Sequence, residues 1–336
     1  MTSSGWPSSL SAARLHVVSG KGGTGKTTVA AALALALASG GRRTLLIEVE
    51  GRQGIAQLFD TPPLPYEERK IAVAPGGGEV RALAVDPEAA LLEYLELFYR
   101  LGMAGRTLRR MGAIEFATTL APGLRDVLLT GKAKECVARN RPDGRPVYDA
   151  VIVDAPPTGR IVSFLDVTTA MADLARSGPI HGQAEGVVRL LHSPLTAVHL
   201  VTLLEDLPVT ETLETVDQLL AVGLPPGAVI ANQVRPQWLP DRSVTAAANG
   251  RVDADRIRAG LSTAGLDLST DVLDGLVAET VEHAVRVHGE TTALARLGPP
   301  LLELPRLIDG VDLGSLYGLA EALVEQGVGV GAGVLA

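Results

Sequence analysis

The residues best suited to chemistry form one glycine-rich run, Gly20-Lys21-Gly22-Gly23-Thr24-Gly25-Lys26-Thr27. Its spacing fits the pattern G-x-x-x-x-G-K-[ST], in which backbone amides of a tight turn point at nucleotide phosphates. Lys26 is expected to reach the β- and γ-phosphates, and the hydroxyl of Thr27 to bind Mg²⁺ directly. The remaining residues expected to surround the phosphates are Gly20, Gly22, Gly23, Thr24, Gly25 and Thr28.

Lys21 is a second lysine in the same loop, directly after its first glycine. On the outer edge of the loop, its long side chain could reach a phosphate held by a neighbouring subunit. There it would neutralise charge that develops during transfer, as an arginine finger does. The alternative is that Lys21 is an ordinary solvated loop lysine.

The loop needs a strand before it and a helix after it, and the sequence supplies both. Leu15 to Val18 is apolar and predicts a buried strand, while Thr27 to Ser39 is rich in alanine and leucine and predicts a helix. The glycines 40 and 41 would end that helix. Its partly positive N-terminus would then point at the phosphates. Asp154 follows the apolar strand 150–153, at the position where an acid holds Mg²⁺ through a water molecule.

Two motifs resemble those of ATPases with a deviant phosphate-binding loop, namely the arsenical pump and guided-entry (tail-anchored protein targeting) ATPases. The first is the loop with its extra lysine. The second is Asp154-Ala155-Pro156-Pro157-Thr158-Gly159-Arg160, followed by Phe164-Leu165, which is similar to the D-T-A-P-T-G-H…L switch II of these proteins. The residues 49–54 resemble an actinobacterial, anion-transporting-ATPase-like subgroup, and the likeness continues to about residue 316.

The resemblance implies a dimeric enzyme that binds and hydrolyses ATP with Mg²⁺, and it assigns further roles. Gly159 would donate its N–H to the γ-phosphate, so that hydrolysis releases the loop after it. Glu50, expected to end the second strand, stands where the family has an aspartate that orients the attacking water. The extra methylene moves its carboxylate by about 1.5 Å. Glu48 is the weaker candidate, since it is expected to face the other side of the strand.

The resemblance also assigns the adenine site. Asn232 follows an apolar strand and matches the asparagine that hydrogen-bonds adenine, although asparagine after a strand is often only a turn residue. Leu304, Pro305 and Arg306 resemble the loop that closes over the base. No guanine-specific motif is present, which favours ATP over GTP.

Apolar runs alternate with helical stretches and predict an α/β fold, a doubly wound and mostly parallel sheet with an α-helical insertion subdomain. The strands are expected at 14–18, 44–49, 80–85, 148–153, 197–203, 228–232 and 300–304. One P-loop domain would span 13–325, with flexible termini at 1–12 and 327–336. Two polar helices, near 253–265 and 270–296, are expected to cover the sheet edge.

The segments 87–146 and 162–192 are predicted helical insertions within this domain. An apolar stripe runs from Leu91 through Phe98 and continues through Met103 to Phe116. In guided-entry proteins such regions bind a membrane-protein client. Mutual packing of the insertions is the favoured interpretation here, because two methionines in the stripe make a poor adaptable groove.

Composition excludes several functions. The chain has 336 residues and a net charge of −8, which argues against binding to nucleic acid. Its one cysteine, Cys136, cannot supply a multi-thiolate metalloid site or the C-x-x-C zinc site of eukaryotic guided-entry ATPases. No apolar run is long enough to cross a bilayer and no secretory signal is evident, so a cytoplasmic protein, at most peripheral to the membrane, is expected.

Two functions remain open at this stage. The first is an ATP-driven switch, a homodimer or a heterodimer with a paralogous ATPase, that couples nucleotide state to a partner or a membrane-protein client. The second is an energising or regulatory ATPase subunit of a membrane transport or envelope assembly. Glu50 in place of aspartate keeps a slow or inactive regulatory role open.

Overall fold

The computed structural model describes residues 5–99, 124–166, 179–298 and 300–329. Its strands are β1 (Leu15–Gly20), β2 (Arg43–Glu48), β3 (Arg69–Ala74), β4 (Gly78–Ala84), β5 (Ala150–Asp154), β6 (Thr196–Thr202), β7 (Pro226–Val234) and β8 (Leu301–Pro305). The helices near the nucleotide loop and the insertions are α1 (Lys26–Ala38), α2 (Gly54–Leu58), α3 (Pro87–Tyr99), α6 (Leu124–Ala138), α7 (Thr158–Leu165) and α9 (Pro179–Leu191). The later helices are α10 (Asp206–Ala221), α11 (Asp241–Ala248), α12 (Ala254–Thr263), α13 (Thr270–Leu294) and α14 (Leu313–Glu325).

The described strands form one sheet in the order β3-β4-β2-β5-β1-β6-β7-β8. All neighbouring strands are parallel except β3, which is antiparallel to β4. The doubly wound, mostly parallel fold expected from the sequence is therefore confirmed. The edge strand β3 was not expected, because its residues 69–74 carry two cations and mix exposed with buried positions instead of forming an apolar run.

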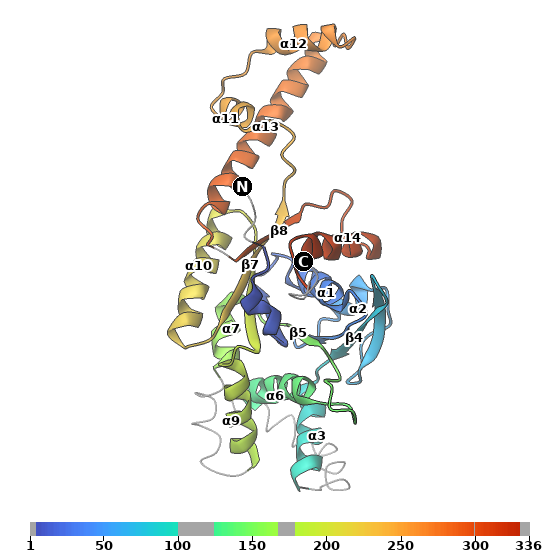
Figure 1. The fold of residues 1–336 in the computed structure, drawn as a ribbon. Helices are drawn as coiled ribbons and strands as arrows, with labels where there is room; N and C mark the ends of the chain where they lie inside the picture. The colour runs from blue at the N-terminus through green and yellow to red at the C-terminus, as the bar shows by residue number, and fades with distance from the viewer. Residues whose placement is uncertain (1–4, 100–123, 167–178, 299, 330–336) are drawn as a thin grey trace.

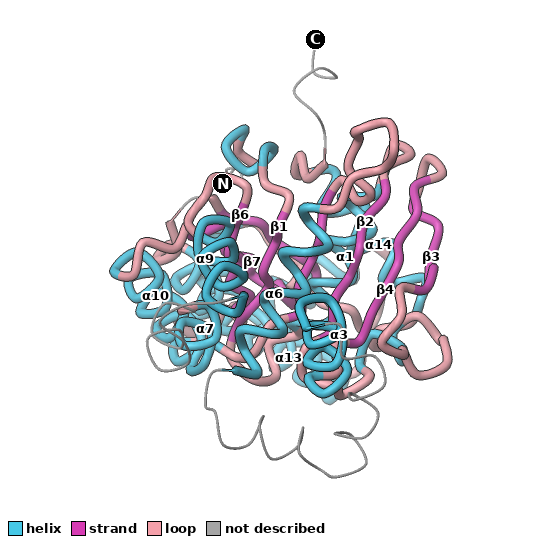
Figure 2. The backbone as a smooth tube through the Cα atoms, turned by 90° about the horizontal axis from the view of Figure 1, so that it is seen from below, coloured by secondary structure: helices cyan, strands magenta, loops and turns pink. Residues whose placement is uncertain are grey.

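Helices cover both faces of the sheet (Figures 1 and 2). On one face α1 is buried along almost its whole length, and it packs with α14 in one apolar cluster. On the other face α6, α7 and α9 join a second cluster with β1, β2 and β5. Burial of α1 on all sides explains its composition, since small alanines allow a helix to lie close to both the sheet and α14.

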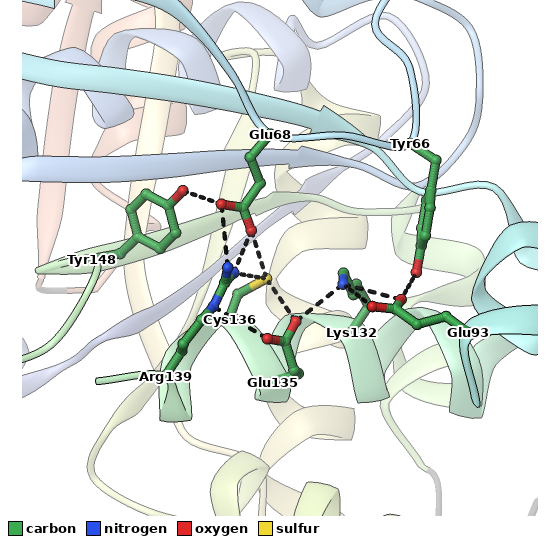
Figure 3. Close-up of polar contacts among 8 residues, drawn as sticks. All are labelled: Tyr66, Glu68, Glu93, Lys132, Glu135, Cys136, Arg139 and Tyr148. Carbon is green, nitrogen blue, oxygen red and sulfur yellow. Dashed lines mark hydrogen bonds and ion pairs between the residues drawn. The ribbon is translucent and has the colours of Figure 1, made fainter. Parts of the chain in front are cut away.

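The insertion helices pack on each other in the described part of the chain, with α6 against α3 and α9. A polar network connects α6 to α3 and to the residues just before β3 (Figure 3). Lys132 lies 2.9 Å from Glu93 of α3 and 3.1 Å from Glu135 of α6, while Arg139 pairs with Glu68 just before β3. Cys136 is buried among these groups, and burial raises the pKa of its thiol to about 12. The thiol is therefore a structural, unreactive group. The predicted stripe beyond Tyr99, from Leu101 to Phe116, lies outside the described residues.

The two helices expected to cover the sheet edge, near 253–265 and 270–296, mostly project away from it, while the C-terminal end of α13 packs at the sheet, where Ala293 joins an apolar cluster with Val229 and Ala231 of β7. Figure 1 shows α11, α12 and α13 extending away from the sheet, at the end opposite to α3, α6 and α9. The arm formed by α11, α12 and α13 has its own small apolar cluster, in which Val244 and Ala247 of α11 meet Ala284 and Val287 of α13. Helix α12 has no buried residue at all. Its polar sequence is that of a helix that projects into solvent. A sequence pattern cannot distinguish such a helix from one that covers a sheet and exposes its outer face.

Parts of both termini pack on the domain, which corrects the expectation of flexible ends. Residues 8–12 form a short 3-10 helix with Leu10 buried, and the N–H of Trp6 donates to the carbonyl of Gln326 at 2.8 Å. Val328 is fully buried. Apolar side chains within Ser- and Gly-rich segments supply this packing, and composition alone underestimates them. Residues 1–4 and 330–336 lie outside the described part.

Two buried histidines, His16 of β1 and His199 of β6, form a neutral hydrogen-bonded chain. The N–H of Ala228 donates to His199 Nδ1 at 3.0 Å, so in the neutral ring Nε2 carries the proton and donates to His16 Nδ1, also at 3.0 Å. His16 Nε2 then donates to the carbonyl of Ala13 at 3.2 Å. The indole of Trp6 stacks on His199. Burial lowers the pKa of His16 to about 4 and that of His199 well below its usual value.

The two buried, neutral histidines predict that the folded protein loses stability in acid. Between pH 6.5 and 4 the unfolded protein binds protons that the folded histidines refuse, so the free energy of unfolding falls as pH is lowered through this range. His16 alone would account for about 3 kcal/mol of the loss. Denaturant melts at pH 7 and pH 4.5 should show a smaller pH effect for His16→Gln than for the natural protein. The exposed His288→Gln serves as control, and an equal loss in all three proteins would contradict the prediction.

Candidate functional site

The glycine-rich loop joins β1 to α1 in the middle of the sheet, at the carboxyl ends of the parallel strands. Two of its glycines are required by space and backbone angle. A Cβ on Gly20 would lie 2.2 Å from the carbonyl oxygen of Val201. Gly25 precedes α1 with φ of +87°, and a Cβ there would lie 2.5 Å from Asn232 Nδ2. Helix α1 begins at Lys26, so the amides of its first turn, which have no intrahelical acceptor, directly follow the loop.

Lys26, Thr27 and Asp154 converge below this loop. The hydroxyl of Thr27 donates to Asp154 Oδ2 at 2.7 Å, because β5 lies beside β1 in the sheet. Burial raises the pKa of Asp154 to about 6, although the Thr27 hydrogen bond and Lys26 act in the opposite direction. Burial lowers the pKa of Lys26, whereas Asp154 and Glu50 raise it. Within the described residues Lys26 is not within ion-pair distance of a carboxylate, so its ammonium group is available to a phosphate.

Glu48 and Glu50 both lie near Asp154, but their side chains have different surroundings. Glu48 contacts the start of α2, whereas Glu50 lines a pocket with Arg125 and Asp126 of α6. Glu48 lies beside Asp154 in the register of β2 and β5, and both glutamates raise the pKa of Asp154. Strand β2 ends at Glu48, two residues before the predicted end at Glu50.

The partners of the two glutamates differ. The carboxylate of Glu48 is buried and accepts hydrogen bonds from the backbone N–H groups of Gln53 and Ile55, the latter at 3.2 Å. Glu50 lies in the loop after β2, where its carboxylate is 3.6 Å from the guanidinium of Arg52. Glu48 is thus occupied in holding the start of α2, and Glu50 is the carboxylate free to meet a water molecule.

Lys21 is held within its own chain. Its Nζ lies 2.6 Å from Glu211 Oε1 on α10, and both side chains are about one-third exposed. No feature of the sequence around Glu211 signals this contact, because it joins residues 190 positions apart. The pair places Lys21 at the outer edge of the loop, on the side of α10.

At the residues assigned to adenine, the structure differs from the expected arrangement more than it does at the phosphate loop. The side-chain amide of Asn232 is buried and donates to the carbonyl of Thr24 at 2.8 Å, so it supports the phosphate loop from β7. Leu304 is wrong as a loop residue: it lies within β8 and is fully buried in the core. Pro305 ends that strand, and Arg306 follows it, both exposed. The apolar run of β8 extends farther than the family motif suggested.

The switch II motif leads directly into a helix. Gly159 is in the first turn of α7, where helix amides have no intrahelical acceptor, and it is exposed. The segment that follows is therefore a helix and not the expected loop. The motif is tied to the strand before the phosphate loop, since Ser19 Oγ donates to the carbonyl of Pro156 at 2.6 Å and the N–H of Ala155 donates to Val18 at 3.0 Å.

Among the described residues, no cluster of three or more histidine, cysteine or acidic side chains could hold a metal ion by itself. The donor set of Thr27 and Asp154 is nevertheless suited to Mg²⁺, which is commonly held by one or two protein oxygens, waters and the phosphates of a nucleotide. The buried carboxylate of Asp154, with its raised pKa, is a group that a cation would stabilise. No described helix combines the length and hydrophobicity needed to span a membrane.

A parallel α/β sheet with this loop, helix and acidic strand end defines a P-loop nucleotide hydrolase. Residues 13–192 match the family model described as anion-transporting ATPase. The chain is 62% identical to ATPase BagA of Mycobacterium tuberculosis over 97% of both proteins. It is 26% identical to the arsenical pump-driving ATPase of Escherichia coli over 92% of this chain and 56% of that protein, and 31% identical to ATPase get3 of Schizosaccharomyces japonicus over 51% of each. The chain therefore belongs to the anion-transporting ATPase family and is an ATPase.

The loop geometry makes a prediction about two of its glycines. Gly25→Ala should destabilise the protein by about 1–3 kcal/mol, because alanine would adopt positive φ and press on Asn232. Gly22→Ala has open space around its Cβ and should leave the free energy of unfolding within about 0.5 kcal/mol. Thermal and denaturant melts of the nucleotide-free variants measure both effects. Equal stability of the two variants would contradict the steric role of Gly25.

Proposed function

We propose that this ATPase is a Mg²⁺-dependent dimeric switch, in which ATP bound by one subunit is completed by a lysine from the other. The observation that carries the proposal is the convergence of Lys26, Thr27 and Asp154 at the adjacent ends of β1 and β5. Loop amides and Lys26 would hold the phosphates, while the N–H of Gly159 would contact the γ-phosphate. Thr27 would bind Mg²⁺ directly and Asp154 through water. When bound, Mg²⁺ would neutralise phosphate charge.

Glu50 is proposed to orient the water that attacks the γ-phosphate. Its carboxylate is near enough to Lys26 to raise the pKa of that lysine, and it is not bound by backbone amides as Glu48 is. The ion pair with Arg52 at 3.6 Å is long and partly solvated, so it would yield readily to a substrate. The side chain of Glu50 is one methylene longer than the aspartate of the family pattern, which is consistent with a slow ATPase.

The roles of the two glutamates can be separated by mutation. Glu50→Gln should keep ATP affinity and lower kcat by about 100-fold or more, since the amide cannot accept a proton from water. Glu48→Gln should lower stability by about 1–2 kcal/mol through its hydrogen bonds to α2, with turnover within a few-fold of normal. Fluorescent-nucleotide binding and steady-state ATPase assays check both. Unchanged turnover in Glu50→Gln would reject the assignment.

Lys21 is proposed to act on the phosphates of the partner subunit. In the single chain its ammonium group is paired with Glu211, so dimer closure would exchange this carboxylate for phosphate oxygens. A half-exposed ion pair is worth about 0.5–1 kcal/mol, which is small compared with charge stabilisation at a desolvated phosphate. Glu211 would therefore keep Lys21 at the edge of the loop without preventing its transfer.

Mixing two inactive variants tests the transfer between subunits. Lys21→Ala should bind ATP and not hydrolyse it, and Lys26→Ala should fail to bind ATP. If Lys21 acts across a dimer, an equal mixture should recover about a quarter of normal activity, because half the dimers would hold one complete site. Glu211→Gln, which releases Lys21, should raise kcat about two- to fivefold. No recovery in a mixture shown to contain mixed dimers would refute action in trans.

Coupling to a partner is proposed to run through α7. This helix begins in the switch II motif, contacts α6 and α10, and packs in the same apolar cluster as α9. A change at the γ-phosphate would thus be transmitted to the helical insertions. Because the described insertion helices bury their apolar faces against each other, a client would be bound by rearranged helices or by the segments between them.

A second candidate is an energising or regulatory ATPase subunit of a membrane transport or envelope assembly, paired with a paralogous partner. It is supported by the similarity to the arsenical pump-driving ATPase along 92% of this chain. A multi-thiolate metalloid site is not available, because Cys136 is the sole cysteine and is buried. ATPase rates alone, with membranes, and with a hydrophobic-helix peptide would distinguish the candidates: peptide stimulation favours the switch, and a membrane requirement favours the transport subunit.

A further inference from the structure

A polar pocket of about 220 Å³ is lined in part by Glu50, and its other lining residues have no role in the proposed chemistry. It is enclosed by the loop after β2, the first turn of α6 and the start of α7. Three guanidinium groups and two carboxyl groups supply its polar lining, while apolar side chains form the rest. The lining residues are Val49, Glu50, Arg52, Arg125, Asp126, Leu129, Pro156, Arg160 and Phe164.

The charges around this pocket are unbalanced. Arg52 is paired with Glu50 at 3.6 Å, but neither Arg125 nor Arg160 has a carboxylate within ion-pair distance in the described structure. The remaining acid, Asp126, is half-buried; burial raises its pKa, and Arg160 and Arg125 only partly counteract this. Two guanidinium groups therefore face the pocket without an anionic partner of their own. Such planar, multiply donating cations are suited to bind phosphate oxygens.

Both helices that border the pocket contribute side chains from their first turns: Arg125 and Asp126 from α6, and Arg160 from α7. Arg160 is also unusual in sequence, since the switch II pattern that this motif resembles has histidine there. The arginine is therefore not explained by the general motif.

The pocket is next to the γ-phosphate position but separate from the phosphate loop. It shares Glu50 with the nucleotide site, and the charge of Arg52 lowers the pKa of Lys26. None of its lining residues belongs to the glycine-rich loop or to α1. A tetrahedral oxyanion could therefore occupy the pocket while ADP remains in the loop.

We propose that this pocket, with Arg125 and Arg160 as its principal ligands, binds the inorganic phosphate released from ATP before it leaves the protein. The inference rests on the proposed function, because it requires cleavage at the Glu50 end of the loop. Arg52 exchanges its contact with Glu50 for the phosphate as the product moves past that carboxylate.

The first experiment uses inorganic phosphate as the probe on the full chain with Mg²⁺ and ADP. Calorimetry should detect phosphate binding, and added phosphate should inhibit steady-state ATPase noncompetitively with ATP. Arg125→Gln with Arg160→Gln should weaken binding by about tenfold or more. Arg256→Gln, on the surface of α12, is the matched control and should bind normally. Replacing both arginines by lysine keeps the charge and should restore part of the affinity, provided that melts show all variants folded.

Purely competitive inhibition, or equal phosphate affinity in the double glutamine variant, would overturn the proposal. The source of the anion is tested in single turnovers, with chemical quench reporting cleavage and a fluorescent phosphate sensor reporting release. The double glutamine variant should change the delay between cleavage and release and leave ATP affinity intact. An unchanged delay would mean that the pocket binds phosphate only from the bulk solution, and it would refute a role in holding the phosphate released from ATP. Failure of the Lys21 or Glu50 roles would instead appear in the mixing and turnover assays, which do not depend on this pocket.

Discussion

The hydrogen bond between Thr27 and Asp154 is the contact on which the rest of the site depends. It exists because β5 lies next to β1, which places the start of α1 beside the end of an apolar strand. From this point the other groups can be located: Glu48 ends the neighbouring strand β2, Glu50 follows in the loop after it, and Asn232 reaches the phosphate loop from β7. A parallel sheet gathers strand ends at one edge, so residues far apart in sequence meet there without a dedicated scaffold.

The second constraint is the position of α6. This helix carries the polar network of Lys132 and Arg139 on its exposed side and an apolar face against the sheet. Its first turn then contributes Arg125 and Asp126 to the pocket near Glu50. The network joins α6 to α3 and to the residues before β3, and the same helix supplies both pocket side chains.

Much of the fold and the centre of the site could be predicted from sequence. The phosphate loop and Asp154 are specified by short-range patterns, because each depends on a glycine turn or on a polar residue that ends an apolar run. Which of Glu48 and Glu50 accepts backbone hydrogen bonds could not be predicted from sequence, because the donors Gln53 and Ile55 are positioned by the start of α2. The predictions for Leu304 and for the arm after β7 were wrong for another reason. Whether an apolar residue ends a strand, or a polar helix covers a sheet, depends on tertiary neighbours.

The contacts absent from any sequence pattern are those between distant side chains. Lys21 with Glu211, and Arg125 with Arg160, come together through packing of α10 on one side and of α6 with α7 on the other. Charged residues on helix surfaces are ordinarily solvated, so nothing in their spacing predicts that these few lie together. Arg160 is the exception, since it departs from a recognisable motif.

The helical arm has a mechanical consequence. Helix α13 is 25 residues long, which corresponds to about 37 Å, and its C-terminal part is anchored by the ion pair of Glu290 with Arg235, three residues after Asn232. A rigid helix works as a lever, so a rotation of only about 5° at this anchor would carry the far end through about 3 Å. Asn232 touches the phosphate loop at one end of that short segment, so three positions of chain join the contact with the loop to the anchor of the arm.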